Sequence, residues 1–227
     1  MRTDPSLVKV RIWDLPTRLF HWALVLAVVG LFISGNIGGN AMVWHFRFGL
    51  SVGALLLFRL VWGVVGGHWS RFASFIYSPR RVLAYLSGKD RAESSLGHSP
   101  LAAGSVFAML LALAAQVLSG LHSDDDIAFA GPLTRFVSND TIALATNYHK
   151  EIGKVIVLIL IVLHLVAIAV YQWRRHRLVG PMLHGDKLLA QTSPAHVPSR
   201  DDASSRVGAL VVFAACAALM FWVSTLG

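Results

Sequence analysis

The chain has 227 residues, of which 55% are hydrophobic and 14% are charged, and its mean hydropathy is +0.60. Soluble domains carry about a quarter charged residues, so this composition excludes an ordinary soluble domain and indicates a membrane protein. The formal net charge of +8 would suggest nucleic acid as the partner of a soluble protein. Here the basic residues gather beside apolar segments, so we expect membrane lipid, and no nucleic acid, as the partner.

Five apolar windows are long enough to cross a membrane, since one crossing needs about 20 mainly apolar residues. Their length and helical periodicity exclude transmembrane β-strands. No small-residue cleavage site follows the first window, so we expect it to remain in the mature chain. The windows predict an all-α membrane protein with spans at Leu19 to Ile37, Val43 to Val65, Pro100 to Leu121, Ile152 to Trp173 and Val207 to Leu226.

Lysine and arginine are concentrated before the first span, between the second and third, and after the fourth. The positive-inside rule therefore predicts a multi-pass protein of the bacterial inner membrane with a cytoplasmic N-terminus and, after five spans, a periplasmic C-terminus. The basic residues on which this depends are Lys9, Arg11, Arg18, Arg71, Arg80, Arg81, Lys89, Arg91, Arg174, Arg175, Arg177, Lys187 and Arg200.

The connecting segments carry further signals. Ser78 followed by Pro79 is a helix start, and the apolar and basic residues after it predict a short interfacial helix. Residues 122–148 form the predicted outer loop, and residues 193–205, rich in Pro, Ser and Asp, predict a flexible linker. We expect a four-helix membrane domain at 8–187, a cytoplasmic linker at 188–205 and an additional transmembrane helix at 206–227.

Cys216 is the single cysteine of the chain. One cysteine excludes an internal disulfide, a covalently attached haem and an iron–sulfur cluster. We expect it to be a small core residue of the last span.

Four histidines lie near the ends of predicted spans, and their depths match in pairs. His21 is near the start of the first span, and His45 is near the start of the second, which runs the opposite way. His149 and His164, fifteen residues apart in the fourth span, differ by about 22 Å in depth and about 60° around the helix. Depth therefore pairs His21 with His164 and His45 with His149.

Ionisable side chains are costly in a bilayer, so four histidines at two matched depths indicate a function. Neutral imidazole nitrogens bind iron well, and two of them fill both axial positions of a haem. We interpret the four as axial ligands of two non-covalently held haems, whose iron then only gains and loses electrons. The alternative is that each histidine is an interface residue bonded to a backbone carbonyl.

A porphyrin between helices needs small residues beside it and cations near its propionates. Glycines of the first two spans could give room, although they also serve plain helix packing. The guanidinium group of an arginine can hold a carboxylate through two parallel hydrogen bonds. For Arg59, snorkelling of the side chain to the cytoplasmic interface is an equal alternative to propionate binding. The glycines are Gly30, Gly35, Gly49 and Gly53, and the candidate arginines are Arg18, Arg47 and Arg59.

The other histidines receive plainer interpretations. His122 ends the third span, where we expect it to interact with the helix dipole, although it could also bond a propionate or pass protons. The remaining five fall in predicted cytoplasmic segments and are expected to be solvated. They are His68, His98, His176, His184 and His196.

The segment from Ile12 to Trp22 (Ile-Trp-Asp-Leu-Pro-Thr-Arg-Leu-Phe-His-Trp) resembles the opening of the bacterial cytochrome b561 and nickel–iron hydrogenase b-type cytochrome family. The resemblance covers about residues 8 to 187. Further matching segments are Trp44-His45 with Gly49, Arg59-Leu60-Val61-Trp62-Gly63, Gly97-His98-Ser99-Pro100-Leu101, and the histidines of the fourth span.

The resemblance implies a four-helix haem-binding bundle with two haem b groups, histidine ligands and electron exchange with quinone. The formate dehydrogenase cytochrome subunit is similar in pairing histidines of the first and second spans with two on the fourth. Two details depart from the family pattern: Ser99 stands where Asn is usual, and Tyr148-His149-Lys150 replaces the more usual His-Glu. They leave the class of partner open.

Together these features predict an electron-transfer subunit of an oxidoreductase system rather than an independent catalyst. It would link quinone, as substrate, to a periplasmic redox protein, either a c-type cytochrome or a dehydrogenase or hydrogenase subunit. The acidic run Asp124-Asp125-Asp126 could dock a basic partner, or form a solvated loop or helix cap.

Two other functions compete with this one. The first is a stand-alone superoxide:quinone oxidoreductase (superoxide oxidase), but an anionic substrate calls for a positive outer surface, and only Arg135 and Lys150 supply that charge. The second is a transporter or plain anchor. The sequence disfavours it because Glu151, at the edge of the fourth span, is the nearest carboxylate that could couple protons.

Overall fold

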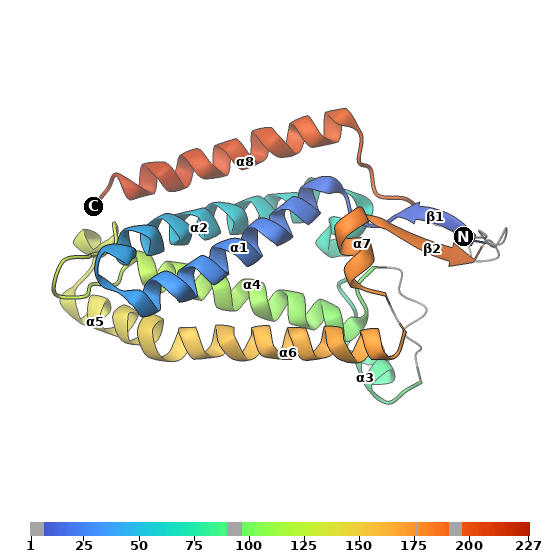
Figure 1. Cartoon of the computed structure of the whole chain (residues 1–227), viewed down its shortest axis with the longest axis horizontal. Helices are drawn as coiled ribbons and strands as arrows, with labels where there is room; N and C mark the ends of the chain where they lie inside the picture. The colour runs from blue at the N-terminus through green and yellow to red at the C-terminus, as the bar shows by residue number, and fades with distance from the viewer. Residues whose placement is uncertain (1–6, 90–96, 176, 191–196) are drawn as a thin grey trace.

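The computed structural model describes residues 7–89, 97–175, 177–190 and 197–227. Over these residues five helical segments are long and apolar enough to cross a membrane, which confirms the all-α membrane fold class. They run side by side as a long bundle (Figure 1). The segments are α1 (Leu15–Ile37), α2 (Met42–Val65), α4 (Pro100–Leu121), the continuous helix of α5 (Asn139–Asn147), η6 (Tyr148–Gly153) and α6 (Lys154–Trp173), and α8 (Ala203–Ser224).

The two ends of the bundle carry different structures, and we name them accordingly. The ribbon end holds the strands β1 (Leu7–Arg11) and β2 (Asp186–Ala190) and the short helices α3 (Pro79–Leu86) and α7 (Val179–His184). The α5 end holds α5, the loop of residues 122–138 and the C-terminus (Figure 1). Short 3-10 turns at Gly39–Ala41, His68–Ser70, Phe72–Ser74 and Thr134–Phe136 complete the connections.

Capping residues set where several helices begin. Asp14, Ser78 and Ser99 each accept a hydrogen bond from the amide three residues ahead, and a proline follows in the first turn. The helix predicted after Ser78 is therefore confirmed as α3, where Leu83 and Leu86 are exposed as an interfacial helix requires. At the α5 end, α1 and α2 join through Gly38 and Gly39, whose positive φ angles of 68° and 51° favour glycine.

The fourth span begins earlier than the sequence predicted. We expected an outer loop up to Tyr148, but residues from Asn139 onwards are helical and continue without a break to Trp173. Ser138 caps this extension by accepting from the Thr141 amide. The extension is half polar, so it lacks the apolar window that marks a span in the sequence.

The β-ribbon was not predicted. β1 and β2 pair antiparallel, with Val8 opposite Leu189, and α7 lies against the start of α1, where Arg18 donates to the Leu183 carbonyl (2.6 Å). Ion pairs hold the ribbon: Asp186 contacts Arg11 at 2.5 Å and Lys9 at 3.1 Å. The chain that follows the fourth span is therefore folded back onto the start of the first.

The flexible linker predicted at residues 193–205 is wrong for its described part. The Ser199 hydroxyl donates to the Ile12 carbonyl (2.6 Å), and its backbone amide donates to the Arg11 carbonyl (2.8 Å). Asp201 pairs with both Arg11 and Arg206. Residues 197–202 are thus docked beside β1, because Asp201 pairs with Arg11 and Ser199 donates hydrogen bonds to the carbonyls of Arg11 and Ile12. Residues 193–196 lie outside the described part of the chain.

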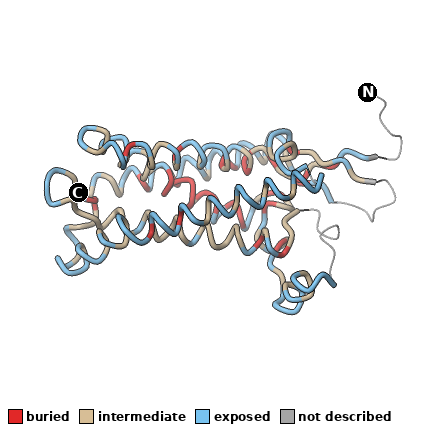
Figure 2. The backbone as a smooth tube through the Cα atoms, turned by 60° about the horizontal axis from the view of Figure 1, so that its bottom comes forward, coloured by how far each residue is buried: buried red, intermediate tan, exposed pale blue. Residues whose placement is uncertain are grey.

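Helix α8 packs against α2, and α2 is the most enclosed element of the bundle (Figure 2). Met220 of α8 fills the space beside Gly53, and Phe213 meets Phe58 edge-on with ring centres 6.1 Å apart. Cys216 is buried in this contact, as predicted. The outward faces of the other spans expose large apolar side chains, as contact with lipid requires.

Candidate functional site

His45 and His149 face each other at the α5 end of the bundle. Their ring centres lie 6.0 Å apart and the rings are nearly perpendicular, at 88°. A metal–imidazole bond is about 2 Å long and the ring centre lies about 1.2 Å behind the nitrogen. Two imidazoles on opposite sides of one metal ion therefore have centres about 6.4 Å apart. The observed separation of 6.0 Å is close to this value.

Backbone carbonyls fix the orientation of both rings. The Nδ1–H of His45 donates to the Leu31 carbonyl of α1 (3.1 Å), and that of His149 donates to the Gln116 carbonyl of α4 (2.9 Å). A histidine whose Nδ1 is occupied in this way presents Nε2 to a metal, and such a carbonyl partner is the usual outer support of a ligand.

The supports of the two rings follow one local pattern on two different helices. Three residues after each carbonyl stands a serine whose Oγ lies 3.4 Å from the same Nδ1, Ser34 for His45 and Ser119 for His149. A glycine comes next in each case. A Cβ atom on Gly35 would lie 3.1 Å from the His45 ring, and one on Gly120 would lie 2.8 Å from the His149 ring. We call each pair a Ser-Gly notch.

Gln116 is a site residue that our sequence reasoning missed. Its side-chain Nε2 donates to the His149 carbonyl (2.9 Å), so the backbone and side chain of Gln116 both hold the same histidine. His149 lies in the π-helical segment Tyr148–Gly153, and π turns often occur at functional sites. The available signal was a polar side chain inside the third span, where polar groups are costly.

The second pair, His21 and His164, lies toward the ribbon end. Both residues are half-buried, and they are close enough to interact electrostatically. The Nδ1 of His21 is buried and has no hydrogen-bond partner among the described residues. The structure brings His45 and His149 together, and it places His21 and His164 toward the same end of the bundle; the pairing of His21 with His164 as ligands stays a prediction.

The four glycines predicted to give room behave differently. A Cβ on Gly30 would meet Phe48 at 2.6 Å and one on Gly53 would meet Met220 at 2.6 Å, so these two serve side-chain packing. Gly35 belongs to a Ser-Gly notch. At Gly49 a Cβ would have no atom of the described residues within 4 Å, so this position alone of the four leaves open space.

The three candidate arginines differ in exposure and in contacts. Arg47 is exposed and lies 4.9 Å over the Trp44 ring, and Arg18 donates to the Leu183 carbonyl. Arg59 is 4% exposed, and its Nη1 has no hydrogen-bond partner among the described residues. Snorkelling to the interface therefore does not describe Arg59.

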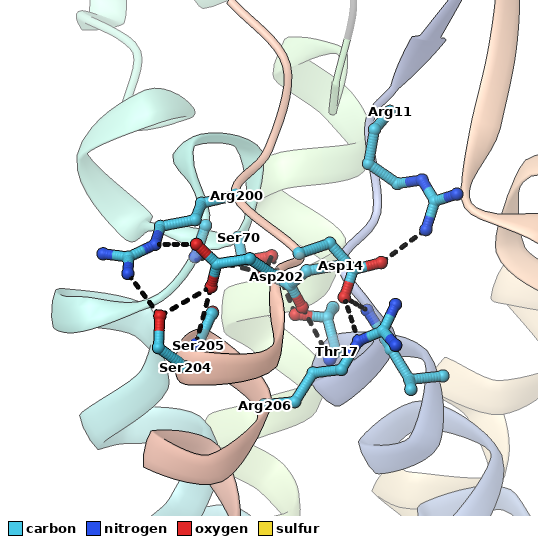
Figure 3. A network of polar contacts seen from close by, with 12 residues as sticks. Arg11, Asp14, Thr17, Ser70, Arg200, Asp202, Ser204, Ser205 and Arg206 are labelled. Carbon is cyan, nitrogen blue, oxygen red and sulfur yellow. Dashed lines mark hydrogen bonds and ion pairs between the residues drawn. The ribbon is translucent and has the colours of Figure 1, made fainter.

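Asp14 organises the ribbon end around α1. This carboxylate is 0% exposed and accepts hydrogen bonds from the Gly67 amide (3.1 Å), the Ser70 hydroxyl (2.7 Å) and the Trp62 indole (3.3 Å). It also caps α1 through the Thr17 amide (2.8 Å). Figure 3 shows this cluster next to the acidic and basic side chains that hold the start of α8. Asp14 thereby connects α1, α2 and the turn that follows α2 at the ribbon end.

The predicted solvation of His98 is wrong. This histidine is half-buried between Trp13 and Phe75, with ring centres 4.8 and 4.4 Å away. The sequence did not show that Phe75 and Trp13 would converge there. His184 is exposed as expected, His68 is half-buried, and His122 donates to the Leu118 carbonyl (2.8 Å) at the end of α4. His176 and His196 lie outside the described residues.

A family model described as prokaryotic cytochrome b561 matches residues 12–185, which is more than half of the chain. This chain belongs to the prokaryotic cytochrome b561 family. The match confirms the resemblance seen in the sequence, and it ends before β2 and α8. No solved structure is significantly similar to the chain.

Two curated relatives are informative. A protein of Escherichia coli (strain K12) described as a probable Ni/Fe-hydrogenase 1 B-type cytochrome subunit is 23% identical over 141 residues, which is 51% of this chain and 60% of the relative. A probable Ni/Fe-hydrogenase B-type cytochrome subunit of Cupriavidus necator is 29% identical over 130 residues, 45% of this chain and 52% of the relative. The chain thus spans about half to three fifths of these relatives' length.

Membership of this cytochrome b561 family, together with the five apolar helices, makes the chain a multi-pass bacterial membrane b-type cytochrome, whose cofactor is haem b. The residues fit this cofactor. Two imidazoles with ring centres 6.0 Å apart and their Nδ1 atoms occupied would both present Nε2 to a haem iron. The Ser-Gly notches on α1 and α4 let the two rings approach these neighbouring helices closely.

Proposed function

We propose that this cytochrome binds two haem b groups, one between His45 and His149 and one between His21 and His164. The observation that carries the proposal is the first pair: facing rings at 6.0 Å, both anchored through Nδ1 to carbonyls of a neighbouring helix. Held by these histidines, haem b would supply a one-electron carrier. The protein contributes ligation, burial and orientation.

The two pairs lie at opposite ends of the bundle, so together they form a route through the thickness of the membrane. We propose that the ribbon end is cytoplasmic, because the basic residues gather there, and that the protein resides in the inner membrane. Electrons would then pass between the quinone pool and a redox protein at the periplasmic α5 end. The hydrogenase cytochrome subunits among its relatives support a redox enzyme as that partner.

The α5 end offers a surface for such a partner. A groove of about 580 Å³ lies between the loop and α5, lined by Asp124, Asp126, Lys150 and Glu151 among others. Lys150 and Glu151 directly follow His149 in the chain, so this groove adjoins the proposed outer haem. Its excess of carboxylates favours a basic partner and disfavours superoxide, which is an anion.

For the haem propionates we propose arginine partners near each haem. Arg47 lies at the α5 end, on the helix that carries His45, and Arg18 and Arg59 lie toward the ribbon end. A guanidinium is a good partner for a carboxylate because it forms charge-assisted, often bidentate hydrogen bonds.

A pyridine haemochrome count on purified protein tests the proposal directly. We expect two haems per chain in the native protein, and one in each of His149→Ala and His164→Ala. His122→Ala is the matched control, because His122 also lies at the α5 end and bonds a backbone carbonyl, and it should keep both haems. A native count of one, or an unchanged count in both variants, would contradict the dihaem assignment.

A second measurement separates the competing functions. In liposomes that contain quinol, we expect quinol to reduce the haems and a basic soluble cytochrome to reoxidise them at a rate that falls with salt. Rapid reduction of the native protein by superoxide alone would instead support the superoxide oxidase.

A further inference from the structure

The ribbon end contains a group of buried polar nitrogens that have no hydrogen-bond partner among the described residues. They are Arg18 Nε, His21 Nδ1, Arg59 Nη1 and His98 Nδ1. A buried polar nitrogen without a hydrogen-bond partner costs stability, so such groups are rare in native proteins. Several such donors at one end of a bundle indicate a ligand that supplies the acceptors.

Arg59 is the strongest of these observations. Its side chain is 4% exposed, and its guanidinium carbon lies 4.5 Å over the centre of the Phe72 ring. The neighbouring carboxylate, Asp14, is occupied by neutral donors from Thr17, Trp62, Gly67 and Ser70. No ion pair to Arg59 is formed within the described ranges. A buried guanidinium nitrogen without an acceptor is costly, so the missing partner should supply acceptor oxygens, and a carboxylate suits a guanidinium best.

His98 packs on the same group of aromatic rings as Arg59. Phe72 contacts Phe75 at 5.9 Å, and Phe75 contacts the His98 ring at 4.4 Å. Tyr77 fixes the backbone there by donating to the His98 carbonyl (2.6 Å). Burial, and next the charge of Arg59, lower the pKa of His98 to about 3. The imidazole is therefore neutral at physiological pH, with one nitrogen that donates a hydrogen bond.

Arg59 also lies at the level of the ribbon-end histidines. It is six residues before the end of α2 at Val65, and His21 is six residues after the start of α1 at Leu15. Both are therefore about 9 Å from the ribbon-end terminus of their helix, at 1.5 Å per residue.

We propose that Arg59 and His98 form a carboxylate-binding pocket that holds a propionate of the ribbon-end haem. Arg59 supplies the charge and His98 supplies a neutral hydrogen-bond donor, while Phe72 and Phe75 exclude water and so strengthen both contacts. His98 is a positioning residue, not an iron ligand. The inference rests on the proposed haem binding and adds to it a residue that lies outside all the spans.

The test compares Arg59→Gln, His98→Phe and His98→Asn. Phenylalanine keeps the ring between Trp13 and Phe75 without a donor, and asparagine restores a donor near the position of Nδ1. His68→Phe is the matched control, since His68 is also a half-buried histidine of the ribbon-end loop that packs on a tryptophan (4.8 Å). If Arg59→Gln does not fold, the two His98 variants decide the question.

Two readouts are combined with the haem count. In the first, haem carrying ¹³C in its propionate carboxylates is incorporated, and the reduced-minus-oxidised infrared difference spectrum is recorded. We expect the ¹³C-sensitive carboxylate bands to shift in Arg59→Gln and His98→Phe, to return toward the native position in His98→Asn, and to stay native in His68→Phe. A propionate gives these bands and a quinone does not.

The second readout is a redox titration. Loss of a unit charge about 10 Å from the iron, at an effective dielectric of about 20, lowers the reduced-to-oxidised ratio of one haem about 15-fold at fixed ambient potential. That equals about 70 mV for a one-electron couple. Native bands and ratios in Arg59→Gln and His98→Phe would overturn the pocket while two haems stay bound. A changed KM for quinol with native carboxylate bands would overturn it in favour of a quinone contact. A native protein without haem would instead refute the proposed function.

Discussion

The Ser-Gly notch behind His149 makes one substitution especially informative. A Cβ on Gly120 would stand 2.8 Å from His149 Cε1 and 3.1 Å from its Nδ1, whereas ordinary carbon contacts are about 3.5–4.0 Å. In Gly120→Ala the ring must move by roughly 0.7 Å, against a metal–nitrogen bond of about 2 Å. Overpacking of this kind costs about 1–3 kcal/mol. We expect haem affinity at the α5 end to fall by between fivefold and about 150-fold.

The same structure supplies graded controls. At Gly35 the nearest approach to His45 would be 3.1 Å, so Gly35→Ala should weaken binding less than Gly120→Ala does. At Gly104, on the same helix as Gly120, a Cβ would meet no described atom within 4 Å. Gly104→Ala should therefore leave both haems in place.

The assay is a haem titration of the apo protein, with the low-spin electron paramagnetic resonance signal as a report on axial geometry. We expect haem affinity to fall most in Gly120→Ala, to fall less in Gly35→Ala and to stay native in Gly104→Ala. If all three variants bind haem as the native protein does, the glycines do not set the ligand position and our interpretation of the notch is wrong.

Three further predictions concern other parts of the structure. Gln116→Leu removes the side-chain donor to His149 and should lower haem affinity about 10–100-fold, measured by the same titration; an unchanged affinity would contradict its positioning role. Asp14→Asn places an amide among donors that now bond a carboxylate, and we expect it to lower the free energy of unfolding by about 3 kcal/mol, measured by denaturant titration; a loss below the error of the measurement would argue against the cluster. Hydrogen bonds from the Ser205 amide and from Arg200 lower the pKa of Asp202 to about 2. Because this folded-state pKa is lower than about 3.9 in an unfolded chain, the start of α8 should be protected above about pH 4 and loosen as the pH falls toward 2. Amide-exchange protection of Ser205 measures this, and flat protection across that range would contradict it.

The sequence by itself determined the number and type of the spans, because a bilayer accepts only helices or closed β-barrels, and the length and periodicity of the apolar windows exclude β-strands. It also predicted how the histidines pair, since helix rise and direction fix their depths along the membrane. The capped start Ser78-Pro79 predicted the first residue of α3. Half-polar helices such as α5 escaped prediction because the apolar window that defines a span says nothing about residues beyond the bilayer core.

The tertiary structure decided what surrounds each of these side chains. Gln116 and the two Ser-Gly notches became visible only once α1 and α4 were placed against the helices that carry His45 and His149. His98 is half-buried rather than solvated because Trp13 and Phe75, far apart in the sequence, meet around it. Burial and contact are properties of pairs of segments, and no pattern within one segment specifies its neighbour.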